Sequence, residues 1–265
     1  MSPLIRRSFP FSRLRRGQRA VQVGTAAWTL DAGICQTIMM ATIVGPTGHV
    51  LAIEPDKNNV DALTDYVRRH NIKNVSVLQR GIWNTRCTKR LVVSRKSSGA
   101  HLLVDALKRK QSSSEPRGNL TTNTGRVEIA IECDTLDNLL TETGYEADYI
   151  NITVNGAEYE VLQGMHELLS RNISVTFPIF GPRSWFPDAF KLLEKNDFSI
   201  VVSDAPPTVR GPAGHKKDRR YRWPKSLPQR LVALASKSSS KAACQPGFDA
   251  ELAIKRSRIE VIPID

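Results

Sequence analysis

The feature that most constrains the fold is a regular alternation, over residues 19–81, of short apolar runs and segments with helical periodicity. In one such segment Val60, Leu63 and Val67 recur at helical spacing, and Asp56 stands where it can cap the helix. Apolar runs that do not alternate with polar residues are typical of parallel strands buried on both faces. The sequence therefore predicts three parallel strands at residues 20–23, 50–53 and 74–78.

The same alternation resumes after residue 145. The predicted strands are Tyr149–Val154, Ile173–Ile179, Phe198–Val202 and Arg230–Ala235, and the predicted helices are Glu158–Leu169 and Trp185–Leu193. Between the two regular parts, residues 82–145 predict strands at Lys89–Ser94 and Val127–Glu132, a helix at His101–Lys110 and a helix that begins at Asp134. Strands that alternate with helices in this way predict a doubly wound α/β fold, with a mostly parallel sheet and helices on both faces.

No linker divides the chain into two cores, so we predict one domain with additions. The α/β domain is predicted over residues 19–236, with irregular insertions at 82–145 and 204–228. A basic arm (residues 1–18) precedes the domain, and a tail (residues 237–265) follows it.

The chain carries 38 Lys and Arg residues against 26 Asp and Glu residues, a formal net charge of +12. The excess is concentrated in residues 1–30, which hold six arginines and no acid, and in residues 210–225, which hold seven basic residues and one acid. Such segments can contact nucleic acid or an anionic membrane, although a solvated arm and loop explain them equally. The first segment also has the Arg-rich, acid-free composition of an organelle transit peptide.

The four cysteines are widely separated, at Cys35, Cys87, Cys133 and Cys244. No two of them have metal-ligand spacing, so we predict no metal site, and their small number fits a reducing compartment. The longest apolar run, Ala32–Val44, is too short and too polar to span a bilayer. We expect a cytoplasmic protein, with peripheral membrane contact through the basic segments as an alternative. The oligomeric state is not predicted.

Two positions indicate a nucleoside site at the end of the predicted sheet. Gly24 follows the first strand, and Glu54 ends the second strand, where its carboxylate can accept hydrogen bonds from both hydroxyls of a ribose. The turn after the first strand lacks the glycine pattern of dinucleotide-binding proteins and that of phosphate-binding loops. An acid at a strand end is also often only a helix cap.

Five segments carry a resemblance to a known family: Val21–Gly24, Val44–Asp56, Asn71–Val75, Thr135–Leu140 and Asp148–Glu158. Over residues 17–180 the chain resembles the S-adenosylmethionine-binding half of FkbM-type methyltransferases. The resemblance implies a class I methyltransferase fold, whose seven-stranded sheet has an antiparallel last strand. It also implies S-adenosylmethionine as the methyl donor and a hydroxyl acceptor on a small molecule or saccharide.

The resemblance also assigns roles to residues. Gly24 would let the backbone approach the methionine part of the cofactor, Glu54 would hold its ribose, and Trp83 would lie near its adenine, unless Trp83 is a core aromatic. The full set of cofactor-binding candidates is Gln22, Gly24, Thr25, Glu54, Asp56, Gly81, Trp83, Thr153 and Asn155.

The chain departs from the family pattern at charged positions. Gln22 stands where the family usually has Asp, and Trp28 stands where it has a second glycine. In the late motif Asn151, Thr153 and Asn155 replace the usual Lys, Asp and Glu. The catalytic candidates are therefore Glu158, as the general base unless it only satisfies the dipole of the helix that it opens, and Thr153, which can hydrogen-bond an acceptor but cannot act as a strong base. His101 and His166 are alternative bases, because the pKa of histidine suits proton transfer.

Two functions stay open. The first is O-methylation of a small molecule or saccharide. The second is a catalytically weak nucleoside-binding module that docks on nucleic acid or an anionic membrane through the basic segments.

Overall fold

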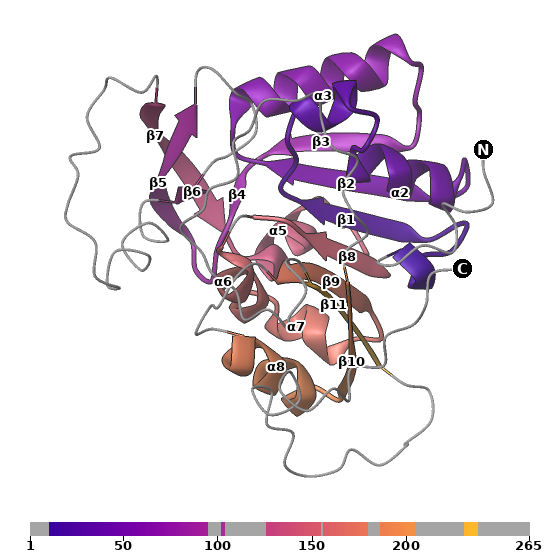
Figure 1. Ribbon diagram of the computed structural model, residues 1–265, viewed down its shortest axis with the longest axis vertical. Helices are drawn as coiled ribbons and strands as arrows, with labels where there is room; N and C mark the ends of the chain where they lie inside the picture. The colour runs from indigo at the N-terminus through magenta and orange to yellow at the C-terminus, as the bar shows by residue number, and fades with distance from the viewer. Residues whose placement is uncertain are drawn as a thin grey trace.

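The computed structural model describes residues 11–94, 102–103, 126–154, 156–179, 186–204 and 231–237. Its main sheet has seven strands in the order β10-β11-β9-β8-β1-β2-β3 (Figure 1). The strands are β1 (Arg19–Val23), β2 (His49–Glu54), β3 (Val75–Gln79), β8 (Tyr149–Ile152), β9 (Ser174–Ile179), β10 (Phe198–Asp204) and β11 (Leu231–Lys237). Only β11 runs antiparallel to its neighbours in this sheet. The predicted α/β fold and its antiparallel last strand are confirmed.

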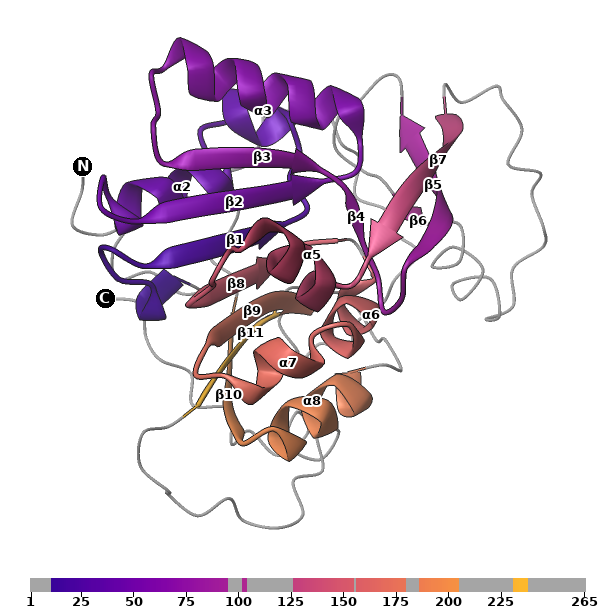
Figure 2. The ribbon, with the colours of Figure 1, turned by 180° about the vertical axis from the view of Figure 1, so that it is seen from behind.

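Helices cover both faces of the sheet (Figures 1 and 2). One face carries α2 (Gln36–Val44) and α3 (Lys57–Arg69), and the other carries α5 (Leu136–Thr143), α6 (Glu158–Gln163), α7 (His166–Ser170) and α8 (Phe186–Lys195). Two short helices, η2 (Phe11–Arg13) and α1 (Trp28–Asp31), flank β1 in the sequence. Successive strand residues face opposite sides, so Val21 and Val23 pack towards α5–α8 while Ala20 packs towards α2.

The start of the described chain already belongs to the core. Phe11 and Leu14, which lie within the predicted basic arm, are each 2% exposed and pack with residues of α2 and with Tyr149. Residues 1–10 and the basic cluster 210–225 lie outside the described residues. No helix in the described ranges is long and apolar enough to cross a membrane.

A second sheet forms from the less regular middle of the chain. Its order is β4 (Gly81–Ile82), β7 (Arg126–Asp134), β5 (Cys87–Ser94) and β6 (Leu102–Leu103). The predicted strands Lys89–Ser94 and Val127–Glu132 are confirmed, and exposure alternates along β7 as the sequence pattern requires. The two sheets stand side by side (Figure 2).

In this region one helix prediction was wrong at the residues described, and the other was confirmed with a later start. The predicted helix His101–Lys110 fails at Leu102–Leu103, which pairs with Val92 and Leu91 of β5, because an unpaired strand edge offers these apolar residues backbone partners. The remainder of that prediction lies outside the described residues. Asp134 ends β7 rather than opening a helix; α5 begins at Leu136, with Thr135 Oγ1 as its cap, accepting from Asn138 N at 3.1 Å.

The predicted helix Glu158–Leu169 is divided in two. α6 ends at Gln163 and α7 begins at His166, with Gly164 and Met165 between them. Gly164 packs directly on backbone: a Cβ at this position would overlap the Trp83 carbonyl oxygen and approach the Asn84 Cα to 3.3 Å. Periodicity extends through this break because both short helices bury the same apolar side, so the sequence did not reveal it.

Candidate functional site

The candidate site lies where the order of strands reverses. From β1 the chain continues to β2 on one side, whereas β8 continues to β9 on the other, and ligands of open α/β sheets bind beyond the carboxyl ends at such a point. Gly24 follows β1 and donates its N–H to the Ile53 carbonyl at 2.8 Å, and Thr153 follows β8 and donates its N–H to the Val23 carbonyl at 2.8 Å. The structure therefore brings Gly24 and Thr153 together.

Gly24 is required at this point by space and by backbone geometry. Its φ is +82°, a conformation that L side chains rarely adopt. A Cβ would overlap the Thr153 carbonyl oxygen and lie 3.3 Å from the Val154 Cγ1. The missing side chain thus lets the Thr153 backbone lie directly against Gly24, so the turns after β1 and β8 meet at the reversal point.

A buried series of hydrogen-bonded neutral side chains, which we call the polar chain, runs under this point. Its members come from β1, the start of α2, β8, β9 and the residue after β8; they are Tyr149, Thr176, Asn151, Gln36, Gln22 and Thr153. Asn151 is the branch point, since its Nδ2 donates to Gln22 Oε1 and to Gln36 Oε1, each at 2.7 Å. Its Oδ1 accepts from Thr176 Oγ1 at 2.7 Å.

The two ends of the polar chain differ. At the deep end Tyr149 OH donates to Thr176 Oγ1 at 3.0 Å, and burial raises the pKa of Tyr149, so the phenol stays neutral. At the other end Gln22 Nε2 donates to the Gly24 carbonyl at 2.6 Å and to Thr153 Oγ1 at 2.8 Å. The polar chain thus links the α2 side of the sheet, where Tyr149 packs, to the candidate site. None of its side chains carries a formal charge.

The sequence contained a pattern that indicates the polar chain, but the pattern lies within a family motif and was not interpreted in that way. In the run from Tyr149 to Thr153, odd positions are polar and even positions are apolar, which is period-2 alternation inside a strand predicted to be buried on both faces. Gln22 and Asn151 were noted as departures from a family pattern, but their contact at 2.7 Å was not foreseen.

Glu54 organises the loops that follow β1 and β2. It is 4% exposed; its Oε2 accepts from Thr25 N at 2.8 Å, and its Oε1 accepts from Asp56 N at 3.0 Å and from Asn59 Nδ2 at 3.3 Å. At least three of the roughly four acceptor positions of a carboxylate are therefore used by the protein itself. A ribose hydroxyl would have to share or replace one of these donors.

Asp56 is a helix cap in this structure. Its Oδ1 accepts from Asn58 N at 3.1 Å at the start of α3, which confirms the capping prediction, and the residue is 3% exposed. Thr25 is half-buried, and its hydroxyl lies 3.9 Å from the Cys35 Sγ. Thr25, Glu54 and Asp56 are thus joined in one loop cluster beside Gly24.

Gly81 and Trp83 are placed with the second sheet. Trp83 is 6% exposed and packs with Leu91 and Ile131, and the Lys89 Nζ stands 4.5 Å from the centre of its ring. This geometry favours the core interpretation of Trp83. A Cβ on Gly81 would overlap the Cys133 Sγ, so the cysteine sulfur occupies the space that Gly81 leaves.

Glu158 opens α6 and is 0% exposed. The loop after β8 carries it, so it approaches the same end of the sheet as Thr153. Asn155, the remaining cofactor-binding candidate, lies outside the described residues.

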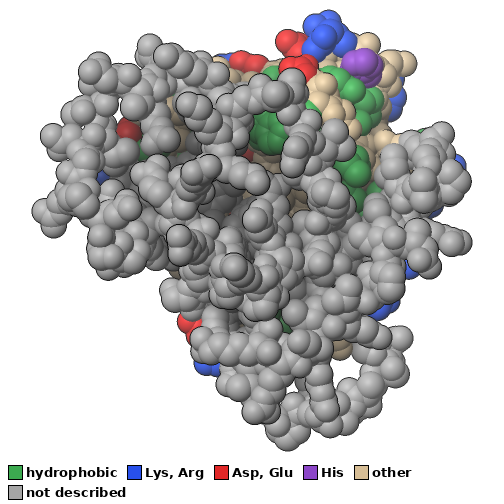
Figure 3. Space-filling view, viewed as in Figure 1, with side chains coloured by type: hydrophobic (Ala, Val, Ile, Leu, Met, Phe, Trp, Pro, Cys, Tyr) green, Lys and Arg blue, Asp and Glu red, His purple; other side chains and the backbone are tan. Residues whose placement is uncertain are grey.

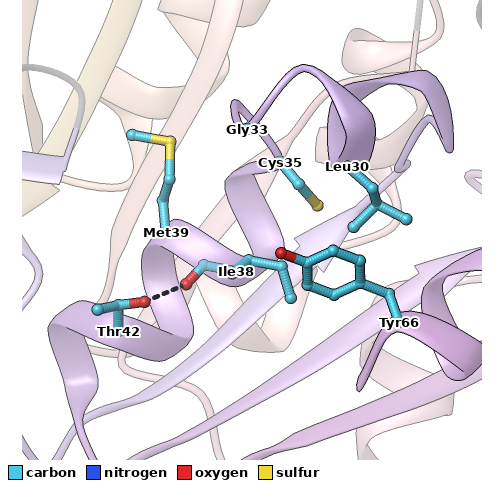
Figure 4. Close-up of a pocket in the computed structure, with 7 residues that line it drawn as sticks. All are labelled: Leu30, Gly33, Cys35, Ile38, Met39, Thr42 and Tyr66. Carbon is cyan, nitrogen blue, oxygen red and sulfur yellow. Dashed lines mark hydrogen bonds between the residues drawn. The ribbon is translucent and has the colours of Figure 1, made fainter. Parts of the chain in front are cut away.

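A small apolar pocket that the sequence did not predict lies behind the loop after Gly24. It has a volume of about 170 Å³ and is lined by Leu30, Gly33, Cys35, Ile38, Met39, Thr42 and Tyr66 (Figure 4). Its walls come from α1, α2, α3 and the residues between α1 and α2, so only the folded chain assembles it. Hydrophobic side chains gather in the upper part of the face shown in Figure 3. Trp28, in α1, is 45% exposed.

Comparison with known proteins gives one family match and several structural likenesses. Residues 22–200 match the model of the methyltransferase FkbM domain. No curated protein matches the sequence.

Three solved structures illustrate the likeness of fold. Methyltransferase FkbM from Methylobacillus flagellatus KT is 14% identical, with a TM-score of 0.46 over 88% of this chain and 48% of that one, so the chain spans about half of its length. Precorrin-6y C5,15-methyltransferase from Geobacter metallireducens is 12% identical, with a TM-score of 0.44 over 85% of this chain and 84% of that one. Aeropyrum pernix fibrillarin, in complex with S-adenosyl-L-methionine, is 13% identical, with a TM-score of 0.43 over 84% of this chain and 67% of that one.

Proposed function

The chain belongs to the FkbM family of S-adenosylmethionine-dependent methyltransferases, and from this premise we propose that it methylates a hydroxyl group of a small molecule or saccharide. The observation that carries the proposal is the direct contact of the Gly24 turn with the Thr153 turn, at the reversal point of a sheet with an antiparallel last strand.

The residues of the site fit the cofactor at the Gly24 end. When bound, S-adenosylmethionine supplies an electrophilic methyl group on a sulfonium. The Gly24 backbone would lie against its methionine part, with the polar chain beneath. Glu54 would hold the ribose by exchanging one of its present donors, Asn59 Nδ2 at 3.3 Å being the longest of the three contacts. Thr25 and Asp56 would keep that carboxylate in position.

A neutral acceptor suits this site better than a charged one. Gln22 and Asn151 are buried and hydrogen-bonded within the polar chain, and the half-buried Thr153 offers only a hydroxyl group. None of the three could pair with a charged acceptor, which would therefore lose hydration without gaining an ion pair. The hydroxyl proton must still leave as the methyl group is transferred. We assign this role to Glu158, whose carboxylate is the nearest acid in sequence after Thr153.

Replacement of Glu54 tests the cofactor site. We expect Glu54→Gln to weaken S-adenosylmethionine binding by at least about 100-fold, or about 2.8 kcal/mol, because an amide cannot accept from both Thr25 N and Asp56 N while also holding a ribose. Calorimetric titration measures the affinity, and thermal melting verifies that the variant folds. The exposed Glu146→Gln is the matched control. Equal affinity in the Glu54 and Glu146 variants would remove Glu54 from the site.

Replacement of Glu158 tests the base. With a neutral hydroxyl acceptor found by screening for release of S-adenosylhomocysteine, we expect Glu158→Gln to lower kcat by about 100-fold or more. Cofactor affinity should stay within a few-fold, and the rise of kcat with pH should flatten, since the ionising group is gone. The exposed Glu167→Gln is the control. An unchanged pH profile would exclude Glu158 as the base.

The same screen separates the two functions considered from the sequence. Cofactor binding without turnover on any hydroxyl acceptor would favour the catalytically weak module. Binding to nucleic acid or anionic vesicles, with a steep dependence on salt, would then be the next measurement.

A further inference from the structure

Two of the cysteines stand directly opposite each other in the second sheet. β5 and β7 are antiparallel, and their register pairs Cys87 with Cys133. Opposite residues of antiparallel strands have Cα atoms about 4.5–5.5 Å apart, which lies within the span of about 4.4–6.8 Å that a disulfide bridges. Both side chains pack in the same apolar cluster, beside Trp83 and Ile131, so they share one face of the sheet.

The two thiols differ in exposure. Cys87 is half-buried at the start of β5, whereas Cys133 is 3% exposed. Burial raises the pKa of Cys133 to about 12, and the neighbouring Cys87 adds to the rise. An oxidant from solution therefore reaches Cys87 first.

In this structure, in which Cys133 is reduced, its side chain lies against Gly81. Its Sγ occupies the space over Gly81 that any larger residue would fill. Rotation about the Cys133 Cα–Cβ bond would turn this sulfur away from Gly81 and towards Cys87. Because Cys87 and Cys133 are already opposite each other, we expect the bridge to form without a change in the pairing of the strands.

We propose that Cys87 and Cys133 are a reversible redox site that forms a cross-strand disulfide when it meets a low-molecular-weight disulfide such as glutathione disulfide. The Cys87 thiolate attacks one sulfur of the oxidant, forming a mixed disulfide and releasing one glutathione thiolate. Cys133 then loses its proton and attacks the Cys87 sulfur, displacing the second glutathione thiolate. Two protein thiols are oxidised, and one glutathione disulfide is reduced to two thiols.

The proposed disulfide would form beside the neighbouring strand β4. β4 pairs with β7 at Gly81↔Cys133 and Ile82↔Asp134, so the sulfur that moves stands over the strand that leads to Trp83. The redox site itself is independent of the proposed methyltransferase function, because it rests on the β5–β7 register and on the packing and exposure of the two cysteines.

Cys35 is the natural control. It is also 3% exposed, but it lies in a different apolar cluster, with Leu30, Ala52 and Leu63 on the α2 and α3 side. Cys35 thus matches Cys133 in burial, but its cluster contains no second cysteine among the described residues. Cys244 lies outside the described residues.

The test uses the folded full-length chain in a glutathione redox buffer, followed by alkylation and peptide mass mapping. We expect a cross-linked pair of peptides holding Cys87 and Cys133 in the wild type and in Cys35→Ser, and dithiothreitol should remove the cross-link. Cys133→Ala should stop at the Cys87–glutathione mixed disulfide, and Cys87→Ser should form no cross-link. Ring closure should accelerate about tenfold per pH unit, following the thiolate fraction of Cys133.

Three results would overturn the proposal. The first is that the mixed disulfide on Cys87 persists in the wild type. The second is that Cys87 or Cys133 cross-links to Cys35 or Cys244 instead. The third is that Cys87 cross-links to Cys133 only after the protein is unfolded in urea. Circular dichroism of the two variants establishes that each is folded. If Cys133→Ala does not fold, the kinetics of the wild type and of Cys35→Ser decide alone.

Discussion

Gly24→Ala is expected to lower the affinity for S-adenosylmethionine by more than about 100-fold, or about 2.8 kcal/mol, and to destabilise the protein as well. The new methyl group would overlap the Thr153 carbonyl oxygen, which is backbone and cannot turn aside as a side chain could. The strands β1 and β8 would have to separate at the end where we propose that the cofactor binds. Calorimetric titration and urea unfolding measure the two effects.

Gly33→Ala is the control that separates two effects of Gly24→Ala, the strain of a positive φ and the steric overlap of the new methyl group. Gly33 also has a positive φ, +68°, but no atom lies within 4 Å of the position its Cβ would take. It should lose only about 1–2 kcal/mol of stability, the usual penalty for an L-residue in the left-handed region. Its affinity for the cofactor should stay near that of the wild type. Equal losses of affinity in the two variants would show that Gly24 matters only for its conformation.

Asn151→Asp is expected to destabilise the protein by about 3–5 kcal/mol at neutral pH. The substitution keeps the shape of the side chain but removes both Nδ2 donors, and it sets a carboxylate against the Oε1 atoms of Gln22 and Gln36, now 2.7 Å away. Urea unfolding at constant pH measures the loss. Asn172→Asp is the matched control, because Asn172 is exposed and should change stability by less than about 0.5 kcal/mol.

The pH dependence of Asn151→Asp gives a second, sharper readout. Burial would raise the pKa of the new carboxyl above its unfolded value of about 3.9, so its neutral form is the one the fold tolerates. The loss of unfolding free energy should therefore be small below the pKa that the carboxyl has in the unfolded state. It should grow as the pH rises from that value to the pKa of the carboxyl in the folded state. A deficit that is independent of pH would mean that Asn151 is not enclosed by the polar chain.

Most of the main sheet was predictable because its signals are local. Runs such as Val50–Ile53 have the composition of buried parallel strands, and Asp56 caps α3 through its own neighbour Asn58. The break at Gly164 was not predictable, since the backbone of Trp83 that excludes a side chain there is distant in sequence. Strand β6 escaped prediction for a similar reason, because β5 supplies its pairing.

The candidate site divides in the same way. Gly24 and Glu54 could be selected because a turn glycine and a strand-end acid have meaning at their own positions. The present partners of Glu54 could be found only in the structure, where Thr25 N, Asp56 N and Asn59 Nδ2 meet its carboxylate.

By itself, the sequence determined the fold class, the antiparallel last strand through family resemblance, and the placing of Gly24 and Glu54 at the ends of β1 and β2. Only the tertiary structure decided which buried polar groups satisfy one another. Gln22 and Asn151 are separated by 129 positions in the chain and meet because β1 and β8 pair in one register. Side-chain hydrogen bonds are short and directional, so their partners are set by strand register and helix docking, which no local pattern encodes.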